Sequence, residues 1–250
     1  MASSRQGSSP LGALALFCAS LVWGASFIFQ KTSIQHMSPL VFNGLRYLLG
    51  ALVLLPVVML ADRFGGNGKM ALWGELRTPA ARRFLVVGGV INGLLMGGAT
   101  MLQHYGMTYT TAGKAGFITA LYILMVPLLG LLQGKRIGRL LCGCVLLGFL
   151  GSYLLCGDIG GKVNIGDALV LLSAVGFAVQ ILATDHYAPH TDCIRLSVME
   201  FTVAGLFSLL VAAVTRQPFS MHGLQMALGA MLYCGIMSSG VGYTLQNVGQ

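Results

Sequence analysis

Charged residues are scarce in this chain: Asp, Glu, Lys and Arg make up 9% of its 250 residues, whereas hydrophobic residues make up 56%. A soluble domain carries about 25% charged residues, so this composition excludes a globule with a fully hydrated surface. The mean hydropathy of +0.79 excludes a disordered chain as well. The composition therefore predicts a membrane protein with several spans.

Motifs for metal, cofactor or nucleophile chemistry are also missing. The six cysteines lack the spacing of a zinc site or a disulfide framework. The sequence has no His-Glu-x-x-His, no Walker lysine motif and no cofactor-binding loop. Ser238-Ser239-Gly240 resembles the Gly-x-Ser-Gly of rhomboid proteases only in part, because Met237 occupies the glycine position. We therefore expect no enzyme, no metal and no cofactor.

The net charge of +8 does not indicate a nucleic-acid partner. A basic domain that binds phosphates concentrates Lys and Arg on one face. Here these residues form short clusters between apolar runs, which is the pattern that sets membrane topology. The expected partner is the lipid bilayer.

Eight mostly apolar runs have the length of about 20 residues that a membrane-spanning helix needs. They cover residues 11–30, 39–61, 84–104, 115–134, 140–157, 168–184, 196–215 and 223–246. The predicted fold class is therefore all-α and polytopic. Pro127 lies inside the fourth run and should kink it, and the glycines of Gly93-x-x-x-Gly97 and Gly130-x-x-x-Gly134 should let helices approach closely.

Lys and Arg are unevenly shared between the two sides of the predicted bundle. The side with the amino terminus and residues 62–83, 135–139 and 185–195 carries ten of them, against four on or near the other side. By the positive-inside rule, the amino terminus is expected to be cytoplasmic.

The third and eighth runs share a phrase at a spacing of 143 residues: Gly97, Leu102, Gln103 and Gly106 recur as Gly240, Leu245, Gln246 and Gly249. A five-helix unit duplicated once, over 11–157 and 164–250, accounts for this spacing. Because five is odd, the copies would have opposite orientations in the membrane. The second copy would hold only three of its helices, so we expect a ten-helix protein truncated after the eighth helix.

Five short motifs, in order and spacing, resemble the EamA family of the drug/metabolite transporter superfamily. They are Trp23-Gly24-Ala25-Ser26-Phe27, Arg46-Tyr47, the stretch 110–119 (TTAGKAGFIT), Val126-Pro127 and Tyr243-Thr244-Leu245-Gln246. The resemblance implies ten helices in two inverted five-helix repeats, a multi-pass location in the bacterial plasma membrane, and export or exchange of small metabolites.

Two charges lie inside predicted spans, where a charge costs about 2.5–3.5 kcal/mol on insertion scales. Arg46 lies seven residues beyond Pro39, roughly 10 Å into its helix. Arg46 would contact an anionic or zwitterionic substrate in a central cavity, or else serve as a structural partner for carbonyls or a carboxylate. Glu200 would be a proton-coupling carboxylate, or else an interfacial residue that pairs with Arg195.

The remaining candidates each have a structural alternative. Gln103 and Gln246 would line the cavity symmetrically or hydrogen-bond between helices. His104 would relay protons or lie at the interface, and Lys114 would lie at the cavity mouth, or else mark topology or cap its helix. The aromatic candidates for cavity walls, which could equally be packing residues, are Trp23, Tyr122 and Tyr243.

We therefore predict a secondary carrier of small metabolites that works by alternating access, coupled to a proton or a counter-substrate. A multi-pass receptor or scaffold is the alternative, and it would have a fully apolar interior. The sequence leaves the substrate and the oligomeric state open.

Overall fold

The structure, a computed structural model, describes residues 10–64, 79–132, 143, 146–148, 150, 151, 164–243 and 245. In this part of the chain every regular element is a helix. The α-helices are α1 Pro10–Ser33, α2 Pro39–Phe64, α3 Pro79–Gly106, α4 Ala112–Ala120, α5 Tyr122–Leu132, α7 Ile165–Tyr187, α8 Cys193–Val214 and α9 Met221–Leu232. A 3₁₀ turn, η1 Ala188–His190, follows α7, and a π-helix, η2 Tyr233–Val241, follows α9.

Seven of the described helical segments are long and apolar enough to cross a membrane. This confirms the predicted all-α, polytopic fold. The fifth expected span, 140–157, lies mostly outside the described residues.

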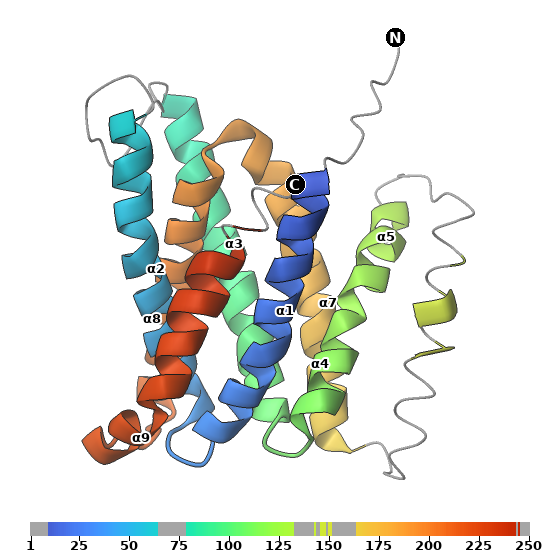
Figure 1. Cartoon of the computed structure of the whole chain (residues 1–250), viewed down its shortest axis with the longest axis vertical. Coiled ribbons are helices and arrows are strands. Elements are labelled where there is room, and N and C mark those ends of the chain that lie inside the picture. The colour runs from blue at the N-terminus through green and yellow to red at the C-terminus, as the bar shows by residue number, and fades with distance from the viewer. Residues whose placement is uncertain are drawn as a thin grey trace.

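The helices stand side by side, with their ends gathered at two opposite ends of the bundle (Figure 1). The upper end in Figure 1 holds the C-terminus of α2, the N-terminus of α3 and η1, and we call it the basic end because Arg63, Arg82, Arg83 and Arg195 lie there. The other, which we call the opposite end, holds the α1–α2 and α3–α4 turns and the N-terminus of α7. The helices α1 and α3 run from the basic end to the opposite end, whereas α2 and α7 run in the reverse direction.

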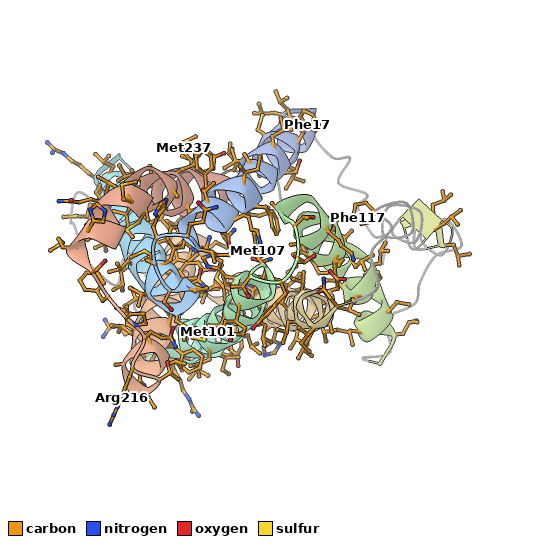
Figure 2. All side chains as sticks on the ribbon, turned by 90° about the horizontal axis from the view of Figure 1, so that it is seen from below. Phe17, Met101, Met107, Phe117, Arg216 and Met237 are labelled. Carbon is orange, nitrogen blue, oxygen red and sulfur yellow. The ribbon has the colours of Figure 1, made fainter. Side chains whose placement is uncertain are left out.

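The bundle is apolar on its outside, and its interior holds polar and charged side chains among apolar ones. On α1, Phe17 is 60% exposed, whereas the buried positions include Arg46 at 4% and Glu200 at 2%. Figure 2 shows Phe17 and Met237 on the outside of the bundle and Met107 in its interior. An apolar outer surface is what a lipid environment requires.

Glycines bring α3 against α8 at backbone distance. A Cβ atom built on Gly93 would lie 2.8 Å from the carbonyl oxygen of Glu200, and one on Gly97 would lie 3.1 Å from Phe207. This confirms the expected close approach at the Gly93-x-x-x-Gly97 motif. Since the contact includes the backbone of Glu200, the packing of α3 fixes where that carboxylate lies.

Two irregularities interrupt the helices. The fourth span breaks at Leu121, between α4 and α5, whereas Pro127 lies inside α5. The break is thus N-terminal to the proline, on the side where its ring crowds the preceding turn. In the last described span, η2 is a π-helix of 9 residues, a wide helix that often marks functional sites.

Candidate functional site

A cavity of about 820 Å³ lies inside the bundle, lined by residues of α1, α2, α3, α4, α5, α7, α8 and η2. Its volume falls within the range of about 300–1,000 Å³ typical of small-molecule sites. Six of the predicted site residues line this cavity: Trp23, Arg46, Gln103, Tyr122, Glu200 and Tyr243.

The lining extends much further toward one end of the bundle than toward the other. On α7 it continues from Phe177 to Asp185 and on to Pro189, which places it at the basic end. In the other direction it reaches Gln30 on α1, Gln103 on α3 and Gly116 on α4, three or four residues from the ends of these helices. The cavity therefore reaches the basic end and stops short of the opposite end.

Arg46 enters the cavity wall from α2. Its Nη2 donates a hydrogen bond of 3.1 Å to the hydroxyl of Tyr47, and its guanidinium carbon lies 4.6 Å from the centre of the Tyr47 ring. Its Nε is buried and has no hydrogen-bond partner. Within the described part of the chain, Arg46 forms no ion pair.

Tyr47 holds Arg46 through a chain of hydrogen bonds with a defined direction. The hydroxyl of Thr100 donates to the carbonyl oxygen of Met96 at 2.7 Å. It therefore accepts from the hydroxyl of Tyr47, which lies 2.6 Å away. This leaves the lone pairs of Tyr47 free to accept from Arg46, so α3 orients the guanidinium indirectly.

Glu200 is the acidic counterpart of Arg46 in the cavity wall. Its Oε1 accepts a hydrogen bond of 2.6 Å from Nε2 of Gln180 on α7. The expected alternative partner, Arg195, pairs instead with Asp62 and Asp192. Glu200 thus has no cationic partner among the described residues.

Arg46 and Glu200 lie at nearby levels along the bundle, although the chain enters α2 and α8 from opposite ends. The helices α2 and α8 are antiparallel, and a Cβ atom built on Gly44 would lie 3.2 Å from the carbonyl oxygen of Gly205. This register places Arg46 beside Val203, three residues from Glu200, or about 5 Å along the helix axis. The two charged side chains therefore line one cavity at nearby levels.

Aromatic side chains from both halves of the chain form part of the wall. Trp23 and Tyr243 pack edge to face with ring centres 5.3 Å apart, and Tyr243 contacts Phe201 at 4.9 Å. Trp23 Nε1 also donates to the carbonyl oxygen of Ser238 at 3.0 Å, which satisfies a carbonyl of the π-helix. These contacts join α1 to η2 and give the cavity one apolar side.

Gln103 combines the two roles that the sequence offered for it. It lines the cavity, and its Nε2 donates to the hydroxyl of Thr119 on α4 at 3.1 Å. Its predicted counterpart Gln246 lies outside the described residues, so the symmetrical pairing of the two glutamines stays a prediction.

His104 lies outside the cavity lining and is completely buried. Its Nε2 donates to the carbonyl oxygen of Gln30 at 3.0 Å, and its Nδ1 lies 3.2 Å from Oδ1 of Asn43. It thus joins α1, α2 and α3 near the end of α3. A pattern of apolar residues does not reveal such a polar contact inside the bundle.

Lys114 also lies outside the cavity lining, at the N-terminus of α4. Its Nζ donates to Oδ2 of Asp167 on α7 at 2.6 Å. Spacing along the chain does not predict this partner, because Asp167 is 53 residues away and precedes the sixth apolar run.

Sequence reasoning missed Tyr47, Thr119 and Gln180, all of which line the cavity. The signal available for Gln180 was a strong hydrogen-bonding side chain inside the sixth predicted span. Among the described residues, no group of three or more His, Cys, Asp and Glu side chains is placed to hold a metal ion.

The fold and the cavity together define a polytopic membrane protein with an internal cavity whose lining includes two buried charged residues. Residues 10–157 and 164–250 match the model of the EamA-like transporter family. The chain therefore belongs to this family of membrane transporters.

Named relatives agree with this assignment. An uncharacterized transporter of Archaeoglobus fulgidus is 30% identical over 84% of this chain and 60% of its own length. The uncharacterized transporter YoaV of Bacillus subtilis is 22% identical over 91% of this chain and 75% of its own, and YvbV of the same organism is 26% identical over 83% and 64%. The chain thus spans less than two thirds of the archaeal relative, and no solved structure matches it significantly.

Proposed function

We propose that this protein is a secondary-active carrier that exports or exchanges small anionic or zwitterionic metabolites by alternating access. The observation that carries the proposal is the presence of two buried, opposite charges in one cavity, Arg46 and Glu200, neither of which has an ionic partner among the described residues. The receptor or scaffold alternative predicts a fully apolar interior, and the two charges in the cavity lining do not fit that prediction.

Unpaired charges within a membrane are costly, so their retention favours a ligand that pairs with them. The guanidinium of Arg46 donates a hydrogen bond to Tyr47 and has no carboxylate partner among the described residues. A carboxylate or phosphate is the kind of group that guanidinium geometry favours as a partner. The same argument assigns to Glu200 either the ammonium group of a zwitterion or a proton.

The direction of the helices supports an inverted five-helix repeat over 11–157 and 164–250. The helix α1 runs from the basic end, whereas α7, its counterpart, runs toward it (Figure 1). Alternating access in such proteins is largely the movement of one repeat relative to the other around a central site. The sequence has no nucleotide-binding motif, so the energy would come from an ion gradient or from exchange.

We further propose that the basic end faces the cytoplasm of a bacterial cell, with the protein in the plasma membrane and its amino terminus inside. The excess of Lys and Arg at this end supports that orientation. In the structure, the cavity would then be open to the cytoplasm.

The test is metabolite profiling of cells that overexpress the full-length gene, followed by flux measurements with the metabolite that changes most. Arg46→Ala should lower flux at least about tenfold, the loss expected for one charge-assisted hydrogen bond, and Arg46→Lys should restore part of it. Arg63→Ala is the matched control, because Arg63 lies exposed on the same helix. Normal flux in an Arg46→Ala protein that inserts normally would contradict the proposal.

A further inference from the structure

A buried ion pair joins α4 to α7 at the opposite end of the bundle. Lys114 Nζ lies 2.6 Å from Asp167 Oδ2, and the two side chains are only 6% and 5% exposed. The other carboxylate oxygen accepts a hydrogen bond of 2.7 Å from the hydroxyl of Thr110. Asp167 thus binds both the α3–α4 turn and the start of α4. Among the described residues, this is the only ion pair at that end.

The ion pair lies between the cavity and the opposite end. The cavity lining ends at Gly116 on α4 and at Phe177 on α7. Lys114 precedes Gly116 by two residues and Asp167 precedes Phe177 by ten. At a rise of 1.5 Å per residue, the pair lies about 3–15 Å nearer the opposite end than the lining does.

Beside the ion pair, two backbones meet directly. A Cβ atom built on Gly166 would lie 2.5 Å from the carbonyl oxygen of Gly106, and one on Gly106 would lie 2.8 Å from that of Gly166. No side chain separates α3 from α7 here. The contact therefore leaves no path for a solute between these two helices.

A third helix contributes to the same place. Lys31, near the end of α1, donates hydrogen bonds to the carbonyl oxygens of Met107 and Thr110 in the α3–α4 turn. The turn is thus bound by α1 on one side and by α7 on the other. An opening at the opposite end between this turn and α1, or between it and α7, would break one of these two attachments.

We propose that the Lys114–Asp167 ion pair keeps the cavity closed at the opposite end, and that it separates whenever the cavity opens there. The inference rests on the proposed alternating access. An ion pair suits this role because water entering the opened end hydrates both charges, which offsets the lost attraction. Apolar packing would gain nothing from the entering water. The pair also joins the two proposed repeats, whose relative movement would open the cavity.

The test measures access to the cavity and needs no substrate. A single cysteine replaces Ala120, which lines the cavity and is exposed to it, in a chain whose six natural cysteines are replaced. A membrane-impermeant maleimide is then added from the side of the opposite end, and the rate of labelling is compared among variants. The double variant Lys114→Gln/Asp167→Asn removes both charges, so no unpaired charge is left buried.

We expect the neutral pair, Lys114→Gln/Asp167→Asn, to raise the labelling rate about tenfold, because that is the change in equilibrium expected when one charge-assisted hydrogen bond is lost. The charge-reversed variant Lys114→Asp/Asp167→Lys should return the rate toward that of the parent. The matched control is Asp62→Asn/Arg195→Gln, which removes an ion pair between α2 and α8 at the basic end; it should leave the rate unchanged.

An unchanged rate in the neutral pair would overturn the proposal. An equal rise in the control would overturn it too, since that result would indicate general loosening of the bundle. A charge-reversed variant that is labelled as fast as the neutral pair would also overturn it. Failure of the proposed function would be seen separately: the labelling rates would change as expected, but the protein would show no measurable flux of any metabolite.

Discussion

Gly166→Ala offers a second test of closure at the opposite end that involves no charge. The added Cβ atom would lie 2.5 Å from the carbonyl oxygen of Gly106 and 2.7 Å from Cβ of Tyr109, whereas ordinary contacts lie at 3.4–4 Å. The nearest neighbours are backbone or backbone-attached atoms, so no side-chain rotation removes the clash. The helices must separate by about 1 Å, and overpacking of this kind costs about 1–3 kcal/mol.

Only the closed arrangement bears this cost, because the clash disappears when α3 and α7 separate. A difference of about 1–3 kcal/mol between two states changes their ratio about 5- to 150-fold. Labelling of a cysteine at Ala120 from the side of the opposite end should therefore accelerate by a factor in this range.

Gly113→Ala is the matched control for this experiment. Gly113 lies on α4 at the same end, and a Cβ atom built on it would have no heavy atom within 4 Å. It should label at the parent rate. The reasoning is refuted if Gly166→Ala labels like the parent, or if both substitutions accelerate labelling equally.

Two further predictions concern the cavity itself. Glu200→Gln keeps an oxygen that can accept the hydrogen bond from Gln180, so the free energy of unfolding should change by about 1 kcal/mol or less. Flux driven by a proton gradient should be lost, whereas substrate exchange should persist. Unchanged gradient-driven flux would contradict a coupling role. Cys193 is exposed and lines the cavity near the basic end, so a bulky thiol reagent applied from that side should block flux, and Cys193→Ser should be resistant. Equal block of that variant would place the reactive thiol elsewhere.

The sequence predicted the helical fold well because the lipid imposes the same requirement on every span. A run of about 20 apolar residues has only one way to satisfy its backbone in a bilayer, so length and composition suffice. Irregular positions were harder to locate. Pro127 predicted a kink in the fourth span, but the break lies at Leu121, and nothing in the sequence marks the π-helix η2.

The candidate site was predicted in part, for an equally physical reason. Arg46 and Glu200 were found because a charge in an apolar run is conspicuous, and both line the cavity. His104, at the end of the third run, and Lys114, directly before the fourth, were also candidates, yet they bind polar groups outside the cavity. What decides between the two outcomes is whether a partner from a distant helix is present, and spacing along one chain carries no such information.

This distinction explains how the buried charges are arranged. Near the two ends of the bundle, Lys114 and Arg195 have carboxylate partners on other helices, Asp167 and Asp62. Those ion pairs need no ligand to balance their charges, and they can instead hold neighbouring helices together. In the cavity, Arg46 has no such partner among the described residues, although a carboxylate lies only about one helical turn away along the axis. A direct pair there would satisfy both charges permanently and would have to be broken for each substrate. Because Arg46 and Glu200 do not pair with each other, their charges gain partners only when a solute of the right charge enters the cavity.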